Sequence, residues 1–205
     1  MSTNNTPLSN QIERNMRDLA MLERATFPRP QHTRIIAVAN QKGGVGKTTS
    51  AVNLAAGLAM GGLSVLVVDA DAQGNASSAL GVPHPVGTPS TYDVIIGGAS
   101  VADVVQPCPD IDGIVVCPAT IDLSGAEIEL VDVERREYRL REALREYVSE
   151  HADIDIVLID CPPSLGLVTL NVMVAADEVM IPIQAEYYAL EGLSQLWNTV
   201  ERIGV

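Results

Sequence analysis

Lysine and aromatic residues are scarce in this chain of 205 residues, and its basic residues are unevenly spread. The chain has 26 acidic and 13 basic residues, a formal net charge of −13, and no Lys or Arg from Thr48 through Glu134. A protein that coats nucleic acid needs many cations on one face, so this composition excludes that class. Apolar residues make up 47% and charged residues 19%, which excludes a disordered chain. With 3% aromatics, the core must consist of Val, Ile, Leu and Ala.

Paired cysteines and a membrane-spanning run are also missing. The three cysteines, Cys108, Cys117 and Cys161, have neither disulfide nor metal-ligand spacing, and the polar N-terminus lacks an apolar signal core. We therefore expect buried, reduced thiols in a cytoplasmic protein. One uncharged run, residues 48–68, contains Thr, Ser and Asn and a double-glycine break, so a helix, a turn and a strand explain it better than a membrane span.

Residues 1–33 differ from the remainder and are expected to form an N-terminal extension. Thr6 is a candidate N-cap, and Pro7 occupies the first helical position. Apolar residues then recur along one helical face: Leu8, Ile12, Met16, Leu19 and Leu22. The pattern predicts an amphipathic helix that docks on the main domain or on a partner, and docking on its own domain is the simpler interpretation. A stiff linker, Phe27–Pro30, follows.

Residues 34–205 are predicted to form one α/β domain, because short apolar runs alternate there with helical patterns. The expected strands cover residues 35–39, 64–68, 114–117, 154–159 and 178–183. The expected helices cover residues 47–60, 100–105, 127–150 (as one or two charged helices), 167–176 and 192–203. Strands that are apolar throughout are typical of a mostly parallel sheet with helices on both faces.

A glycine-rich loop, Asn40–Thr49, separates the first strand of this domain from its first helix. Glycines let successive backbone N–H groups turn inward around an anion, and the helix N-terminus adds its positive dipole. Lys47 would reach the β- and γ-phosphates of a nucleotide, and the Thr48 hydroxyl would bind Mg²⁺. The alternative is a glycine turn with an incidental lysine, which the complete Gly-Lys-Thr sequence in this context disfavours.

The two lysines of the chain both lie in this loop, and they are not equivalent. Gln41 replaces the usual first glycine of such loops, and Lys42 follows it, too early to duplicate Lys47. Two cations on one loop indicate that one of them serves a different set of phosphates. We expect Lys42 to act across a dimer interface, in the manner of an arginine finger.

Aspartates end two of the expected strands. Asp69 and Asp71 follow the strand at 64–68, and Asp160 follows the strand at 154–159. Ligands of open α/β sheets collect at the carboxyl ends of strands, where an aspartate can hold Mg²⁺ or orient an attacking water. A single strand-end aspartate is more often a turn or helix cap. Beside the phosphate loop, the functional interpretation is favoured for Asp71 and Asp160, whereas Asp69 is either structural or positions the loop.

Several motifs together carry a resemblance to a known family. They are KGGVGKTT at 42–49, DADAQGN at 69–75, IDCPPSLG at 159–166, and the stretches 121–127 and 184–193. The first three are similar to the deviant Walker A motif, switch I, and the Walker B and switch II region of the ParA/MinD superfamily of ATPases, in its chromosome-partitioning ParA (Soj) branch. Ala72 stands where switch I usually has proline. The match runs from about Arg34 to Ile203 and implies a P-loop NTPase-type sheet.

The resemblance implies a role for each residue of the site. Nucleotide binding would fall to the whole loop: Lys42, Gly43, Gly44, Val45, Gly46, Lys47, Thr48 and Thr49. Lys42 would reach the nucleotide of the partner subunit, Lys47 would bind phosphate, and Gly43 would let two subunits approach closely. Asp71 would position the hydrolytic water, so Lys42, Lys47 and Asp71 would be catalytic. The Mg²⁺ site would comprise Thr48, Asp160 and Asp71.

The resemblance also implies partners and a location. ATP and Mg²⁺ would drive a sandwich homodimer that binds nonspecific nucleoid DNA in the cytoplasm, and a ParB-type centromere-binding protein would stimulate hydrolysis. No membrane partner is expected. Relatives continue for several strands and helices beyond the position of Val205, so we expect the C-terminal part, with its adenine and DNA contacts, to be missing.

Three other functions remain open at this point. A MinD-like ATPase that positions the division site would share the loop, although Gln73-Gly74-Asn75 favours the partitioning branch. A reductase similar to nitrogenase iron protein would need cluster cysteines, and the three cysteines supply no obvious pair. The third is a truncated, non-hydrolysing interaction module.

One cluster of arginines resembles a DNA-binding stripe: Arg135, Arg136, Arg139, Arg141 and Arg145. Glutamates interleave with them at helical spacings of three and four: Glu134, Glu137, Glu142 and Glu146. We therefore expect a solvated, salt-bridged face rather than a nucleic-acid interface.

Overall fold

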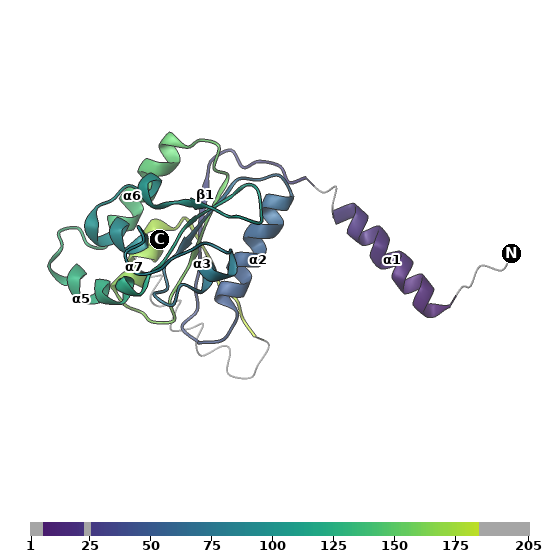
Figure 1. Ribbon diagram of the computed structural model, residues 1–205, viewed down its shortest axis with the longest axis horizontal. Coiled ribbons are helices and arrows are strands. Elements are labelled where there is room, and N and C mark those ends of the chain that lie inside the picture. Colours follow the sequence, from purple (N-terminus) through teal and green to yellow (C-terminus); the bar gives the residue numbers. More distant parts are fainter. Residues whose placement is uncertain (1–5, 23–25, 185–205) are drawn as a thin grey trace.

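The computed structural model describes residues 6–22 and 26–184, in which six strands form one sheet (Figure 1). The strands are β1 (Arg34–Val38), β2 (Val65–Asp69), β3 (Gln106–Pro107), β4 (Ile114–Cys117), β5 (Ile156–Asp160) and β6 (Glu178–Met180). Their order is β3-β4-β2-β5-β1-β6, and every neighbouring pair is parallel except β3 with β4. The predicted mostly parallel α/β sheet is confirmed.

Helices cover both faces of the sheet, as the sequence predicts (Figure 1). One face carries α2 (Lys47–Met60) and α3 (Asn75–Ala79). The other carries the π-helix η1 (Asp93–Gly97), α4 (Val101–Val104), the 3₁₀ helix η2 (Ile121–Gly125), α5 (Ala126–Glu129), the 3₁₀ turn η3 (Leu130–Asp132), α6 (Arg139–Glu150) and α7 (Leu167–Ala175). The two layers leave β2 and β5 buried along their whole length.

Side chains of the central strands alternate between the two helix layers, as the pleat of a strand requires. In β2, Leu66 and Val68 belong to the core on the α4–α7 side, whereas Val65 and Val67 belong to the core on the α2 side. Tyr147 is the one aromatic side chain in the buried core of the described residues. The expectation of an aliphatic core is therefore confirmed.

Element bounds agree with the sequence pattern for α2 and β4 and differ most in the charged stretch 127–150. There α5 and η3 end before α6 begins, and Arg135 takes a left-handed conformation with φ 53° in the break. The break allows both Leu130 and Leu140 to reach the core. The short helices α3 and η1 were not predicted, because five residues carry too little periodicity. The helix expected at 192–203 lies outside the described residues.

Ion pairs occupy the surface of the arginine cluster. The pairs are Arg135–Glu142 at 2.6 Å, Arg136–Glu137 at 3.6 Å and Arg145–Asp177. The first two join the interleaved arginines and glutamates, but at separations of seven residues and one residue and not at the expected spacings of three and four, whereas Arg145 reaches an aspartate that follows α7. A salt-bridged surface is thus present in place of an open basic stripe.

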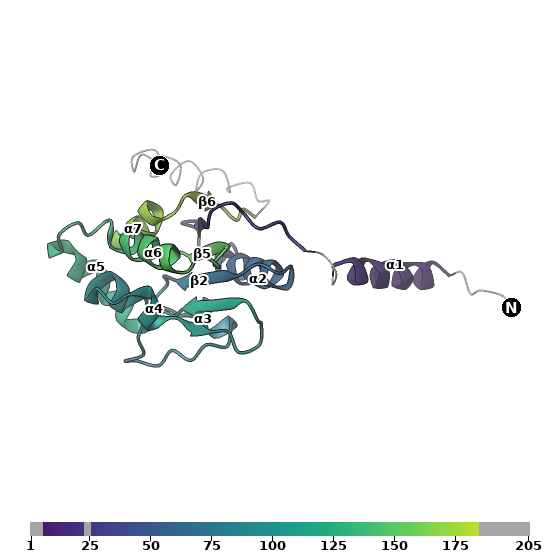
Figure 2. The same cartoon turned by 90° about the horizontal axis from the view of Figure 1, so that it is seen from above.

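The N-terminal helix, α1 (Pro7–Leu22), forms as predicted and is capped by Thr6. The Ser9 N–H donates to Thr6 Oγ1 at 3.2 Å, and the Thr6 N–H donates to Ser9 Oγ at 3.0 Å. In two perpendicular views α1 lies apart from the sheet and its helices (Figures 1 and 2). Four residues of its apolar stripe are exposed, from 46% at Ile12 through Leu19 and Met16 to 67% at Leu8. The expectation that this stripe docks on its own domain is therefore wrong.

The linker after α1, in contrast, is attached to the domain at the end of α2 that is remote from the glycine-rich loop. The Phe27 N–H donates to the Gly61 carbonyl at 3.0 Å, and the phenyl ring occupies the space where a side chain at residue 61 would lie. The Arg29 guanidinium lies 3.7 Å from the buried Asp155 carboxylate. Since α2 has 14 residues, α1 leaves the domain about 20 Å from that loop.

Candidate functional site

Three neighbouring strands end at the same level beside the glycine-rich loop. Val38 at the end of β1 is in register with Asp160 at the end of β5, and Asp160 is in register with Asp69 at the end of β2. The loop begins directly after β1. The sheet therefore brings the two strand-end carboxylates to the edge from which the loop emerges, as the sequence predicts.

The loop adopts a conformation that turns it around the start of α2. Gly44 and Gly46 have φ of 73° and 88°, a left-handed region that glycine enters at little cost. Lys47 begins α2 and is 8% exposed, and its Nζ donates to the Lys42 carbonyl at 3.5 Å. The buried ammonium thus faces the concave side of the loop, where α2 contributes the positive end of its dipole.

Residues beyond β6 hold the loop from the other side. The Asn40 Nδ2 donates to the Pro182 carbonyl at 2.9 Å, and the Asn40 Oδ1 accepts from the Lys42 N–H at 3.0 Å. The Gln184 Nε2 donates to the Gly44 carbonyl at 3.1 Å. The Lys42 side chain is exposed, so its position differs from that of Lys47, as expected.

Asp160 has a fully buried carboxylate, and neither oxygen has a hydrogen-bond partner. Burial, together with the negative charges of Asp69 and Asp71, raises the pKa of Asp160 to about 7. Thr48 and Lys47 act in the opposite direction, although the Thr48 hydroxyl completes no hydrogen bond of normal geometry. A buried carboxylate without donors is destabilising, so this position favours a cation.

Orphaned polar atoms are confined to this site in the described part of the chain. Within residues 6–22 and 26–184, the buried side-chain polar atoms without a partner are the two Asp160 oxygens and Gln41 Nε2. Gln41 lies in the loop, and Asp160 lies at the end of the strand beside it. The unsatisfied groups therefore coincide with the site that the sequence predicts for a nucleotide.

Asp69 is equally buried but fully engaged. Its Oδ2 accepts from the Ser77 N–H at 2.8 Å and from the Ser77 hydroxyl at 2.7 Å, and its Oδ1 accepts from the Asp71 N–H at 3.2 Å. Burial raises the pKa of Asp69, and these hydrogen bonds oppose the rise. Asp69 thus ties the loop after β2 to α3, which is a structural role.

Asp71 is half-buried and lies in the loop that Asp69 organises. Its Oδ1 accepts from the Gln73 N–H at 3.0 Å, and its carbonyl accepts from the Gly74 N–H at 2.9 Å. One carboxylate oxygen, Oδ1, therefore closes a turn, whereas the other, Oδ2, accepts no hydrogen bond from the described residues.

The donor set fits Mg²⁺ bound together with phosphate. Among the described residues, no group of three or more His, Cys, Asp and Glu side chains is arranged to hold a metal. Mg²⁺ commonly keeps water and substrate oxygens and takes one or two protein ligands. Asp160, whose two oxygens lack donors, and the neighbouring Thr48 suit that chemistry better than an all-protein metal centre.

The three cysteines do not contribute to this site as thiolates. All three are free and buried, as the sequence predicts. Burial raises the pKa of Cys117 to about 12 and also raises the pKa of Cys161. The thiols of Cys117 and Cys161 are therefore neutral in the core. Separately, no helix within residues 6–22 and 26–184 combines the length and the apolar character that crossing a membrane requires.

Sequence reasoning missed residues that organise the site from a distance. Ser77 is fully buried and binds Asp69, and Glu127 accepts hydrogen bonds from the first turn of α7. Glu127 belongs to a motif that the sequence singles out, but without a role. Ser77 lies eight residues after the strand-end aspartate Asp69. This spacing brings the two residues into contact only because α3 folds back toward the strand end.

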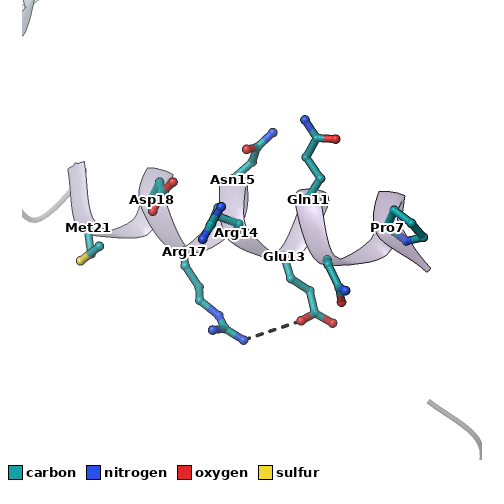
Figure 3. Close-up of a pocket in the computed structure, with 9 residues that line it drawn as sticks. Pro7, Gln11, Glu13, Arg14, Asn15, Arg17, Asp18 and Met21 are labelled. Carbon is teal, nitrogen blue, oxygen red and sulfur yellow. Dashed lines mark ion pairs between the residues drawn. The ribbon is translucent and has the colours of Figure 1, made fainter. Parts of the chain in front are cut away.

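A volume of about 800 Å³ borders α1, but it is no binding site. Its lining residues all belong to this one helix, and in Figure 3 Gln11 and Asn15 lie on one side of the helix and Glu13 and Arg17 on the other, with no common space between them. The contact drawn among them is an exposed ion pair, with Arg17 at 3.6 Å from Glu13. The space is open solvent beside a single helix.

Comparison with known proteins gives consistent matches to the domain. The family described as AAA domain matches residues 33–204. The chromosome partitioning protein ParA of Myxococcus xanthus is 51% identical over 170 residues, which cover 83% of this chain and 59% of that protein. The sporulation initiation inhibitor protein Soj of Bacillus subtilis is 52% identical, with coverage of 83% and 66%. The chain thus spans roughly 60% of the length of such relatives.

Solved structures agree with this fold. A cobyrinic acid a,c-diamide synthase from Mycobacterium smegmatis with bound ADP and magnesium has a TM-score of 0.76 and 41% identity, covering 83% of this chain and 68% of that one. A plasmid partition protein from Borrelia burgdorferi has a TM-score of 0.74 and 25% identity, covering 85% and 75%. The similarity covers the domain that contains the glycine-rich loop.

Proposed function

The chain belongs to the AAA-domain family, and from this premise we propose that it is the nucleotide-binding part of a ParA/Soj-type partitioning ATPase. The observation that carries the proposal is the pairing of a buried Lys47 in a glycine-rich loop with the donor-less carboxylate of Asp160 on the adjacent strand. A polyphosphate with a divalent cation supplies the charges that both groups lack.

Each side chain of the loop has a distinct task in this proposal. Gly44 and Gly46 present backbone N–H groups to the phosphates, and Lys47 neutralises their charge. Thr48 and Asp160 hold Mg²⁺, with Asp71 at the edge of the same site. The bound Mg²⁺ supplies neutralising charge at the phosphate oxygens. Asp71 orients the water that attacks the terminal phosphate, through the carboxylate oxygen that Gln73 does not bind.

We further propose an ATP-dependent homodimer in which the exposed Lys42 reaches the nucleotide of the partner subunit. The similarity to partitioning proteins supports a cytoplasmic, nucleoid-associated protein that binds nonspecific DNA and responds to a ParB-type protein. The acidic charge of −13 favours a basic partner segment over direct phosphate contact by the described surface.

ATP turnover by the purified chain tests the proposal. We expect hydrolysis that requires Mg²⁺, with Lys47→Ala lacking nucleotide binding because the buried phosphate counterion is gone. Arg141→Ala, which removes one positive charge from an exposed position on α6, is the matched control. Unchanged ATP affinity in Lys47→Ala would refute the site. Nucleotide binding without turnover, with or without DNA and a ParB-type protein, would favour the non-hydrolysing module.

Asp71→Ala separates hydrolysis from assembly. We expect dimers to form with ATP and to persist, because Lys47 still binds phosphate and Thr48 and Asp160 still hold Mg²⁺, while the water loses its orienting carboxylate. Sedimentation velocity with ATP, beside a phosphate-release assay, measures both properties. If ATP produces no dimers in Asp71→Ala, the turn that Asp71 closes has a structural role instead.

A further inference from the structure

The carboxylate of Glu127, which lies on α5, caps α7, the helix that follows the loop after Asp160 (the Asp160 loop). The Leu167 N–H donates to Glu127 Oε2 at 2.6 Å, and the Val168 N–H donates to Glu127 Oε1 at 3.3 Å. These are the first two amides of α7, whereas Glu127 lies 40 residues earlier on α5. Gly166, which precedes α7, has no side chain that could cap the helix. The Glu127 carboxylate therefore serves as the cap.

Gly166 provides the space that this carboxylate occupies. A Cβ atom at residue 166 would overlap the carboxyl group of Glu127. The backbone of Gly166 has φ −102°, which any residue adopts, so glycine there provides space for the Glu127 carboxylate and serves no conformational need. Glu127 and Gly166 are therefore complementary positions.

The loop between Asp160 and α7 is held at both of its ends and touches the phosphate loop. The Thr169 hydroxyl in the first turn of α7 donates to the Ser164 carbonyl at 2.6 Å. Ser164 and Leu165 also line a hollow with Gln41 that is too small for water. A displacement at the start of α7 would thus reach the glycine-rich loop through direct packing.

The segment 119–127 also contacts the other strand-end loop. The Ala119 N–H donates to Ser77 Oγ at 3.1 Å, and the Ser77 hydroxyl donates to Asp69 at 2.7 Å. One end of this segment is thus bonded to α3, which follows the loop after β2, and its other end, through Glu127, to the start of α7, which follows the loop after β5.

We propose that Glu127 is a positioning residue that fixes the Asp160 loop, and that segment 119–127 couples this loop to the loop that carries Asp71. The kinetic readout of this inference rests on the proposed ATPase function. Glu127 acts through the amides of α7 and touches no reacting atom. Small displacements of catalytic groups can reduce turnover on the order of a hundredfold without abolishing substrate binding.

The first test is a set of variants at two glutamates of α5. Glu127→Ala should lower kcat by about tenfold or more with little change in KM for ATP, because the loop loses its position while Lys47 still binds phosphate. Glu127→Gln, which keeps an acceptor oxygen, should recover part of this loss. Glu129→Ala is the control, because Glu129 is exposed and accepts from Tyr92 instead. Equal losses in kcat for Glu127→Ala and Glu129→Ala would overturn the inference.

The second test is a double-mutant cycle with Gly166→Ala. If alanine acts by displacing the Glu127 carboxylate, Gly166→Ala should lower kcat in the wild-type background and have little further effect beside Glu127→Ala. Independent, multiplicative losses would show that the two positions do not act through each other.

Amide hydrogen exchange tests the contact without ATP. The amides of Leu167 and Val168 should exchange about tenfold faster in Glu127→Ala and at the wild-type rate in Glu129→Ala. If wild type hydrolyses no ATP, the proposed function fails while this measurement still decides the role of Glu127. If hydrolysis is normal and both amides keep their protection in Glu127→Ala, the positioning role is overturned instead.

Discussion

The ends of β2 and β5 carry the same residue type at the same level of the same sheet, yet their carboxylates differ. Asp69 and Asp160 are in register, and neither is exposed to solvent. Asp69 accepts hydrogen bonds from Ser77 and from the Asp71 amide, whereas no described group donates to Asp160. A carboxylate with its donors inside the chain is structural, and one without them requires a ligand.

The sequence that follows each strand explains this difference. After β2 the chain turns through Gly74 into α3, which returns the Ser77 amide and hydroxyl to Asp69. After β5 come two prolines, Pro162 and Pro163, which have no N–H to donate. The remaining amide of that turn, from Cys161, donates to β1 at 3.3 Å. The three residues that directly follow Asp160 therefore offer it no backbone donor.

The largest effect should come from Asp160→Asn, measured as a function of pH without nucleotide or Mg²⁺. The folded pKa of about 7 lies above the ordinary 3.8, so the folded state holds a proton that the unfolded state releases. This contribution to stability is complete below pH 3.8 and is lost as pH rises through about 7. Relative to Asp160→Asn, wild type should lose about 3 kcal/mol of unfolding free energy between about pH 5 and about pH 8.

Urea unfolding in EDTA at several pH values measures this difference. Asp112→Asn, at an exposed position that precedes β4 at the opposite edge of the sheet, is the matched control and should keep the pH dependence of wild type. Parallel pH profiles for wild type and Asp160→Asn would contradict the contrast between the two strand ends.

Asp69→Ala should have the next largest effect, which should be a loss of stability where Asp160→Asn changes the pH dependence. It leaves the amides of Asp71 and Ser77 without their acceptor in a buried place, so we expect a loss of about 2 kcal/mol of unfolding free energy. The loss should persist when ATP and Mg²⁺ are absent. Urea unfolding at neutral pH measures it, and a variant as stable as wild type would mean that Asp69 is not the structural member of the pair.

Ser77→Ala should have the smallest effect of the three. It removes the hydroxyl that donates to Asp69 and accepts from the Ala119 N–H, while the Ser77 amide bond to Asp69 remains. We expect a loss of about 1 kcal/mol of unfolding free energy. Thermal unfolding of Ser77→Ala beside Ser78→Ala, an exposed neighbour on α3, measures it. Equal effects at the two serines would contradict the assignment.

Much of the fold could be predicted because its signals are local. Uninterrupted apolar strands, the glycine-rich loop and the Gly-Lys-Thr sequence predict a covered parallel sheet with a phosphate loop at its edge, and α2 and β4 have the predicted bounds. The register of Asp69 with Asp160 could not be predicted, since it depends on β5 lying between β1 and β2. The apolar stripe of α1 is a second example. Its periodicity predicts the helix correctly but does not determine which surface, if any, covers the stripe.

The sequence by itself determined the chemistry: which residues carry charge at the loop and at the strand ends, and that Pro162 and Pro163 cannot donate. Only the tertiary structure decided which carboxylate finds partners, because Ser77 reaches Asp69 only when α3 folds back, and Glu127 reaches α7 from 40 residues earlier in the chain. Local sequence patterns indicate the backbone conformation and the hydropathy of a segment. The number of donors that surround a buried oxygen is a property of packing, and it separates Asp69 from Asp160.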